Sequence, residues 1–184
     1  MRVISGLAKG VNLLTPDGLS TRPTADRVKE AMFSIIQFEL PGAHVLDLFG
    51  GTGQLGIEAM SRGAKDAVFV DAQSSACNLI RENLKRTKME QQARIVRADY
   101  LTFLKNCQEK FDIILLDPPY AEVFLENSLK MITEIDILQT NGIIVAERPV
   151  EKDLPWDYPG LFRSKDYKYG KTLLTVFRKD DAKE

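Results

Sequence analysis

The stretch HVLDLFGGTGQLG, residues 44–56, decides the fold. A short apolar run ends in a glycine-rich loop, and a helical pattern begins directly after that loop. Glycines allow the backbone of such a loop to approach a ligand closely at the start of a helix. The stretch therefore predicts a strand, a ligand-binding loop and a helix, which together form the first unit of an α/β fold.

The same alternation continues along the chain. Short apolar runs alternate with amphipathic stretches, and this pattern predicts a parallel sheet covered by helices on both faces. The expected strands are Val45-Leu46, 67–70, 93–96, 111–116 and 142–147, and the expected helices are 54–61, 74–86, 100–107 and 123–134. The last two runs, 162–169 and 172–178, are separated only by Gly170-Lys171 and predict an antiparallel hairpin that closes the sheet.

The N-terminal residues precede this regular pattern. Residues 1–15 form short apolar runs that end at the turn signal Pro16-Asp17-Gly18, which predicts a small hairpin outside the core, an appendage. A helix is expected to follow, from a cap at Thr24 to about Leu40. Residues 1–184 are thus expected to form one domain, with an N-terminal extension (1–41) and a catalytic core (42–184).

Composition limits the possible functions. The chain has 184 residues, of which 44% are hydrophobic, and a formal net charge of −1, which suits one domain rather than a highly basic binding protein. Cys77 and Cys107 lie far apart, and the single histidine, His44, stands at a strand start, so neither a disulfide nor a metal site is expected. No apolar window approaches the roughly eighteen residues of a membrane span, and the N-terminus has no signal-peptide pattern. We expect a cytoplasmic protein with no membrane partner.

Four successive strands each place an aspartate at or just after their carboxyl end: Asp47, Asp71, Asp99 and Asp117. In open parallel sheets ligands bind beyond this edge. Asp47, near the glycine loop, would repel a pyrophosphate but attract the ammonium and sulfonium groups of S-adenosylmethionine. Asp71 could accept hydrogen bonds from ribose hydroxyls and Asp99 from the adenine amine, although Asp99 equally suits a helix N-cap. The expected cofactor-binding residues are Asp47, Phe49, Gly50, Gly51, Thr52, Gly53, Asp71 and Asp99.

The glycine loop leaves one alternative open. From Gly51 to Gly56 it also reads G-x-G-x-x-G, and Asp71 lies at a suitable distance for a ribose hydroxyl, as in nicotinamide-dependent oxidoreductases. Against that class, His44 precedes its strand and is the only histidine, so no plausible acid for a hydride site is evident.

The tetrad Asp117-Pro118-Pro119-Tyr120 follows the buried run 111–116. Two prolines fix both φ angles and remove two backbone donors, so the Pro118 carbonyl can point into a cleft as an acceptor. Asp117 and this carbonyl could each accept one N–H of an exocyclic amine, while Tyr120 stacks on the base. The tetrad predicts methylation of a base amine without a metal ion. A stiff turn that ends the strand is the alternative.

The glycine loop and the tetrad resemble motifs of the RsmD-type bacterial 16S rRNA guanine-N2 methyltransferases. Two N-terminal segments share this resemblance: Arg2-Val3-Ile4-Ser5-Gly6, and Arg22-Pro23-Thr24 followed by Asp26-Arg27-Val28-Lys29-Glu30. The resemblance covers nearly the whole chain, including Tyr169-Gly170. It implies a Rossmann-like, seven-stranded sheet of the class I methyltransferase type. It also implies S-adenosylmethionine as methyl donor, with S-adenosylhomocysteine as product, and the N2 amine of guanine 966 in small-subunit ribosomal RNA as acceptor.

The resemblance further implies that the N-terminal hairpin and Arg22-Pro23-Thr24 help to grip RNA. Because the stretch Leu7-Ala8-Lys9-Gly10-Val11 is less basic than in many relatives, RNA affinity should depend more on Arg22, Arg27 and the C-terminal Lys168 and Lys171. Apart from the resemblance, a C-terminal basic cluster could hold a phosphate backbone or be ordinary solvated surface; it consists of Arg163, Lys165, Lys168 and Lys171. The expected RNA-binding residues are Lys9, Arg22, Thr24, Arg27, Lys168 and Tyr169. We expect a monomer that acts on RNA within the small ribosomal subunit or an assembly intermediate.

A DNA adenine-N6 methyltransferase is a further alternative, because donors and acceptors around one amine do not distinguish guanine N2 from adenine N6. Little sequence is inserted between the strands, however, so the chain has no evident domain for reading a duplex.

Overall fold

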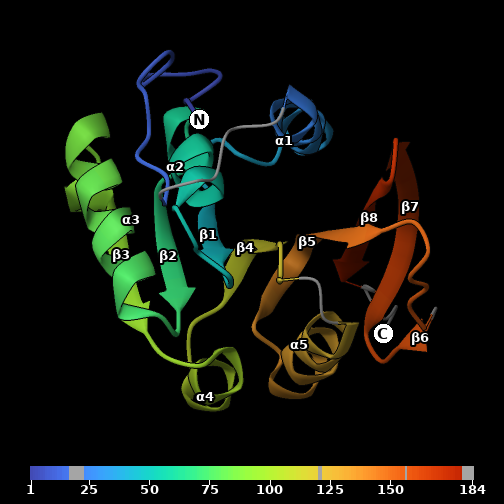
Figure 1. Cartoon of the computed structure of the whole chain (residues 1–184). Coiled ribbons are helices and arrows are strands. Elements are labelled where there is room, and N and C mark those ends of the chain that lie inside the picture. Colours follow the sequence, from blue (N-terminus) through green and yellow to red (C-terminus); the bar gives the residue numbers. More distant parts are fainter. Residues whose placement is uncertain (17–22, 120–121, 156, 180–184) are drawn as a thin grey trace.

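The computed structural model describes residues 1–16, 23–119, 122–155 and 157–179. These residues form a single mixed sheet with helices on both faces (Figure 1). The strand order is β3-β2-β1-β4-β5-β8-β7-β6, in which β1 to β5 run parallel and β8, β7 and β6 are antiparallel to their neighbours. The strands are β1 His44–Asp47, β2 Asp66–Asp71, β3 Ala93–Arg97, β4 Phe111–Leu116, β5 Leu138–Pro149, β6 Asp157–Tyr158, β7 Leu161–Tyr169 and β8 Thr172–Lys179.

The expected parallel sheet and its closing antiparallel hairpin are confirmed. The seven expected strands are all present, and the two-residue strand β6 extends the sheet to eight. Strand β6 pairs only through Asp157 with Phe162 and Tyr158 with Leu161, and so short a strand leaves no periodic signal in the sequence. Strand β5 is longer than expected because its end continues to pair with β8 as far as Pro149.

Helices α1, α2 and α3 cover one face of the sheet, and α4 and α5 cover the other (Figure 1). Each face has its own hydrophobic core, called here the first core, under α1 to α3, and the second core, under α4 and α5. Strand β4 contributes alternate residues to both, which explains its apolar run from Ile113 to Leu116. The helices are α1 Pro23–Ile35, α2 Gln54–Ser61, α3 Ser74–Thr87, α4 Tyr100–Asn106 and α5 Glu122–Ile135, with a short 3₁₀ turn at Glu90–Gln92.

Helix α1 differs from its prediction at both ends. It begins at Pro23, so Thr24 lies in its first turn rather than before it, and proline suits that first position because its missing N–H needs no partner there. The helix ends at Ile35, not Leu40, and gives way to turns. Leu40 is buried nevertheless, so the apolar periodicity extended beyond the hydrogen-bonded helix.

The expected N-terminal hairpin is present in reduced form, as one antiparallel bridge between Arg2 and Asn12. Asp17 and Gly18 of the predicted turn lie outside the described residues. The expectation of an appendage outside the core is wrong. Residues 1–15 bury three apolar side chains in the first core: Val3, Ala8 and Leu13.

A buried carboxylate explains how the extension is held in place. Glu58 on α2 is fully buried, and its oxygens accept the backbone N–H groups of Ile4 at 2.8 Å and Ser5 at 3.0 Å. Lys29 of α1 lies 3.6 Å from the same carboxylate and donates to the Arg2 carbonyl. An uncompensated buried charge is costly, so these contacts bind the N-terminal segment and α1 to α2 and the sheet beneath it.

Candidate active site

The carboxyl ends of the parallel strands border a cavity of about 1350 Å³. It lies at the edge where ligands bind in open α/β sheets. The cavity brings together nine of the residues predicted from the sequence: Phe49, Gly50, Gly51, Thr52, Asp71, Asp99, Asp117, Pro118 and Pro119. Tyr120, the last residue of the predicted tetrad, lies outside the described residues.

The glycine loop is fixed by backbone hydrogen bonds. Gly50 N–H donates to the Val70 carbonyl at 2.8 Å, which ties the loop to β2. Gly53 is the N-cap of α2 and has a φ of 78°, a conformation that other residues rarely adopt. A side chain at Gly56 would place its Cβ 2.3 Å from the ring of Phe69, so this glycine permits α2 to pack closely on β2. The spacing of the glycines thus serves both the loop and the packing behind it.

Two of the predicted aspartates also support the backbone. Asp71 accepts the N–H of Gly51 at 2.9 Å and that of Gln73 at 2.8 Å, which joins the glycine loop to the end of β2. Asp99 is the N-cap of α4, and its Oδ1 accepts the N–H groups of Leu101 at 3.0 Å and Thr102 at 3.3 Å. The N-cap interpretation of Asp99 is therefore confirmed, and Asp99 also lines the cavity.

Asp47 lies beneath the glycine loop and is only 1% exposed, so it does not line the cavity directly. Its Oδ2 accepts the N–H of Gly56 at 3.0 Å. Its Oδ1 is buried and has no hydrogen-bond partner among the described residues. Burial raises the pKa of Asp47 to about 7, the hydrogen bond from Gly56 opposes that rise, and the negative charges of Asp117 and Asp71 add to it.

Asp117 and Glu147 form a carboxyl pair at the ends of β4 and β5. Leu116 pairs with Ala146 in the sheet, so the next residue on each strand is a neighbour of the other. Burial raises the pKa of Asp117 to about 6. Burial, and then the charge of Asp117, raises the pKa of Glu147 to about 8. Glu147 was missed in the sequence, although it ends the expected strand 142–147 as an acidic residue, the same signal that identified the four aspartates.

Three aromatic rings form an apolar wall of the cavity. The ring of Tyr100 lies 5.4 Å from that of Phe49 and 5.2 Å from that of Phe124, between ring centroids. Only Phe49 was predicted. Phe124 stands on α5, far from the glycine loop in sequence, so no local pattern connects the two. Such a wall offers a planar ring an apolar surface close to the acceptor groups of the aspartates.

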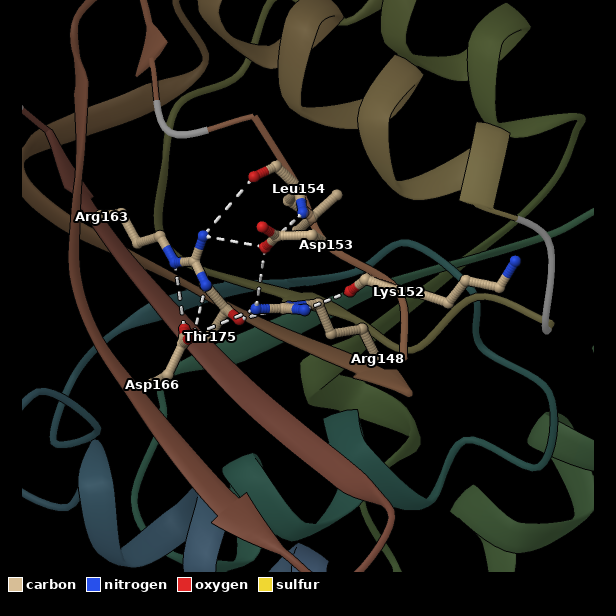
Figure 2. Close-up of polar contacts among 7 residues, drawn as sticks. All are labelled: Arg148, Lys152, Asp153, Leu154, Arg163, Asp166 and Thr175. Atoms are coloured by element: carbon tan, nitrogen blue, oxygen red, sulfur yellow. Dashed lines mark hydrogen bonds and ion pairs between the residues drawn. The ribbon is translucent and has the colours of Figure 1, made fainter. Parts of the chain in front are cut away.

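The cavity lining also includes the segment 149–154, from the last residue of β5 onward. Figure 2 shows Lys152, Asp153 and Leu154 of this segment beside Arg148 and Arg163. Two buried arginines, Arg148 and Arg163, are each 4% exposed in their side chains and share the carboxylate of Asp166. Arg148 also donates to the Thr175 hydroxyl at 2.8 Å and to the carbonyl of Lys152. Arg163 reaches the Asp153 carboxylate and the Leu154 carbonyl at 3.5 Å each. Both arginines therefore hold this segment against the sheet.

This arrangement corrects the predicted C-terminal basic cluster. Arg163 is buried and ion-paired, so it does not offer its charge to a phosphate backbone. Lys168 is exposed on β7, Lys171 lines the cavity, and Tyr169 packs partly against the first core. At the other end of the chain, Lys9 and Arg27 are exposed, Arg22 lies outside the described residues, and only the backbone of Thr24 is described.

The described ranges, 1–16, 23–119, 122–155 and 157–179, offer neither a metal site nor a membrane-spanning helix. No group of three or more histidine, cysteine, aspartate or glutamate side chains in those ranges could hold a metal ion. None of the helices there has the length and apolar character needed to cross a membrane. His44 stacks on Phe111 at 4.6 Å and pairs with Asp66, which confirms its structural role at the start of β1.

A family model described as Conserved hypothetical protein 95 matches residues 1–178. The chain belongs to this family. The RsmD-type resemblance is thereby confirmed. The Bacillus subtilis (strain 168) protein YlbH is 40% identical over 97% of this chain and 99% of its own length. A Haemophilus influenzae protein named Ribosomal RNA small subunit methyltransferase D is 35% identical over 84% of this chain and 81% of its own length.

Among solved structures, that of Escherichia coli yhhF matches with a TM-score of 0.88 and 27% identity, over 97% of both chains. The fold is that of the class I methyltransferases, as predicted. Membership of the family makes this protein a methyltransferase by descent, and the cavity at the strand ends is its candidate active site.

Proposed function

We propose that this protein transfers a methyl group from S-adenosylmethionine to the exocyclic N2 amine of a guanine in small-subunit ribosomal RNA. The observation that carries the proposal is the joining of two sets of groups in one cavity. The glycine loop and its aspartates lie on one side, and Asp117 with Pro118 lies on the other. The RNA substrate comes from the names of the relatives, and guanine 966 from the family resemblance.

The residues of the first set fit S-adenosylmethionine, which supplies a methyl group on a positively charged sulfur. Burial is the main cause of the raised pKa of Asp47, and the negative charges of Asp117 and Asp71 add to it. These neighbouring negative charges would attract the cationic cofactor. The unpartnered Oδ1 of Asp47 can accept a hydrogen bond from an ammonium group, directly or through water. Asp71 and Asp99 would hold the ribose and adenine beside the aromatic wall of Phe49, Tyr100 and Phe124.

The same electrostatics argue against a nicotinamide cofactor. The pyrophosphate of such a cofactor is doubly negative and would lie at the glycine loop, where Asp71 accepts the Gly51 N–H and Asp47 lies beneath. Like charges in a partly buried site raise the free energy of binding. Separate calorimetric titrations with S-adenosylhomocysteine and with NAD test this choice, and we expect binding of the first only.

The second set would hold the acceptor amine. The carboxylate of Asp117 and the carbonyl of Pro118 would each accept one of its N–H bonds, and this orients the nitrogen lone pair away from the ring and toward the methyl group. As the nitrogen attacks, it gains positive charge, which the buried carboxylate stabilises. Asp117 is also placed to take the proton that the nitrogen releases. Tyr120 remains the proposed stacking residue.

The extension and the basic residues would bind the RNA around the target base. Lys9 and Arg27 stand exposed near the N-terminus, and Lys168 stands exposed on β7. Arg22, Thr24 and Tyr169 complete the proposed contact set. We propose that the substrate is the small ribosomal subunit or an assembly intermediate, that the protein acts as a monomer, and that it works in the cytoplasm.

Mapping the modified nucleotide tests the proposed function. Small-subunit ribosomal RNA from cells that lack this protein would be incubated, free and as assembled particles, with the purified protein and S-adenosylmethionine. We expect mass spectrometry of nuclease fragments to find one new N2-methylguanosine. Methylation of an adenine, or of DNA but not of ribosomal particles, would overturn the guanine-RNA assignment in favour of adenine-N6 chemistry.

A further inference from the structure

Glu147 is a carboxyl group that lines the cavity beside Asp117 and that the proposed amine contacts do not use. Leu115 and Val145 pair with each other and belong to the first core, whereas the next pair, Leu116 and Ala146, belongs to the second. Alternation along the strands therefore directs Asp117 and Glu147 to the same face of the sheet. Neighbouring strands lie about 4.8 Å apart, so the two carboxyls are adjacent, and both line the cavity.

The neighbouring arginine does not neutralise Glu147. Arg148 is the next residue on β5 and points to the opposite face, where it binds Thr175, Asp166 and the Lys152 carbonyl (Figure 2). The interactions that shift the pKa of Glu147 include burial and the charge of Asp117, with no cation among them. A half-buried carboxyl without a compensating cation is costly for the fold, and a ligand that donates hydrogen bonds to it would recover part of that cost.

We propose that Glu147 reads the base edge beside the amine and selects guanine by binding its N1–H group. This inference rests on the proposed function and adds a specificity-determining residue to it. On guanine, the N2 amine and N1–H present three adjacent hydrogens. Asp117 and Glu147 stand at the ends of neighbouring strands, and Pro118 follows Asp117 along the cavity, so the two carboxyls and the Pro118 carbonyl would accept these three hydrogens.

Adenine presents a different edge to the same groups. Its N6 amine offers two hydrogens, but the neighbouring N1 is an acceptor. An ionised Glu147 would face the lone pair of N1 and repel it. A protonated Glu147 would donate to N1 of adenine and make one bond, whereas with guanine it would accept from N1–H and donate to O6. In either protonation state Glu147 makes the better match with guanine.

The experiment compares guanine with 2-aminopurine, which keeps the N2 amine but has an acceptor at N1 and no O6. Small-subunit RNA, free and assembled with its proteins, would carry either base at the acceptor position mapped above. For the wild-type protein we expect kcat/KM for guanine to exceed that for 2-aminopurine about 10- to 100-fold, the range of one good bidentate base contact. In Glu147→Leu this ratio should fall to within about threefold of one, chiefly through loss of guanine activity.

A conservative variant and a matched control separate recognition from folding. Glu147→Gln keeps an acceptor and a donor in place, so it should restore most of the preference for guanine. Glu134→Gln, at an exposed position of α5, should leave both rates unchanged. Affinity for S-adenosylhomocysteine and the unfolding midpoint are measured for each variant. We expect Glu147→Leu to keep that affinity within about threefold of wild type and to have an unfolding midpoint no lower than that of wild type, because a costly carboxyl is removed.

The outcomes distinguish the two proposals. If Glu147→Leu binds S-adenosylhomocysteine normally but keeps the wild-type ratio of guanine to 2-aminopurine, the role of Glu147 is wrong and the proposed function stands. The same conclusion follows if the wild-type protein methylates both bases equally. If the wild-type protein methylates no guanine in either form of the RNA, the proposed function fails, and the role of Glu147 fails with it.

Discussion

The two sides of the cavity are built in different ways. On the cofactor side, Asp47, Asp71 and Asp99 each bind backbone N–H groups of the nearby loop or helix. On the acceptor side, Asp117 and Glu147 lie next to each other with raised pKa values. The wall beside them depends on arginines from separate strands. On the first side each carboxylate accepts at least one backbone N–H, and Oδ1 of Asp47 has no partner among the described residues. On the second side, the two neighbouring carboxyls would accept donors from a ligand.

The substitution Asp117→Ala should show the largest difference between the sides, because it should reduce methyl transfer strongly and cofactor affinity little. We expect methyl transfer to fall by at least about 100- to 1000-fold, since a group that stabilises charge in the transition state is lost. Affinity for S-adenosylhomocysteine should stay within about threefold of wild type, because the framework of the cofactor side is untouched. Single-turnover kinetics and calorimetry measure the two quantities. Retained activity on assembled small-subunit particles would remove Asp117 from its proposed role.

The substitution Arg148→Met should mainly destabilise the part of the cavity wall formed by the segment 149–154. Removing one partner of a buried charge network costs about 3 kcal/mol, so the free energy of unfolding should fall by that order. Arg94→Met is the matched control, because Arg94 pairs with Glu109 at the surface, where both side chains are about half exposed and such pairs contribute under about 1 kcal/mol. Urea titration measures both variants. Equal losses in the two would show that the buried network has no special part in stability.

The pH dependence of stability should reflect raised pKa values on both sides, because the pKa of Asp47 on the cofactor side is also raised, to about 7. The pKa values of Asp117 and Glu147, about 6 and about 8, lie above the ordinary values of 3.8 and 4.5. A carboxyl whose pKa is raised by folding stabilises the folded state below its unfolded pKa, and that stabilisation is lost as the pH rises through the folded pKa. Stability should therefore fall between about pH 4 and pH 8 through these groups.

The variant Glu147→Gln measures how much of this loss of stability with rising pH comes from Glu147. The variant carries no charge at this position, so its free energy of unfolding should fall less with rising pH than that of wild type, by a difference on the order of 2 kcal/mol near pH 8. Urea titrations at several pH values measure the difference. Identical pH profiles for wild type and Glu147→Gln would mean that Glu147 titrates normally in the folded protein.

The contrast between the sides also explains what could be predicted from the sequence. The glycine loop, the strand ends and the N-cap at Asp99 follow from spacings of a few residues, and these were predicted. The Arg148–Asp166–Arg163 network was not, because it depends on the pairing of β5 with β8 and of β8 with β7. The burial of Asp47 was missed for a related reason, since spacing gives its place near the loop but not the direction of its side chain.

The N-terminal extension illustrates the same limit. Its apolar residues suggested an appendage because no local pattern connects them with Glu58, more than 50 residues away. Contacts at that separation follow from the folded arrangement of α2 and the extension. Sequence reasoning was therefore most reliable where a structural feature depends on short spacings at a strand end.

On the cofactor side, Asp71→Asn should moderately weaken the binding of S-adenosylhomocysteine. The amide keeps one oxygen acceptor but loses the charge, so a hydrogen bond to the Gly51 N–H and one to the ribose would be weakened or lost. We expect the dissociation constant for S-adenosylhomocysteine to rise about tenfold, as for one charged hydrogen bond. Activity at saturating cofactor should change less than in Asp117→Ala. A variant that binds normally but cannot transfer the methyl group would contradict the division between the sides.

The smallest expected effect concerns Lys168, exposed on β7 beyond both sides of the cavity. A single phosphate contact is sequence-independent and screened by salt, so Lys168→Gln should weaken RNA binding about two- to fivefold at moderate salt and reduce the slope of log affinity against log salt by about one. Lys105→Gln, on the exposed end of α4, serves as the control with the same loss of charge. Filter binding across a salt series measures both slopes. An unchanged slope for Lys168→Gln would exclude this lysine from the RNA contact. A reduced slope with unchanged cofactor affinity would show that the RNA-binding surface continues from the acceptor side of the cavity along β7.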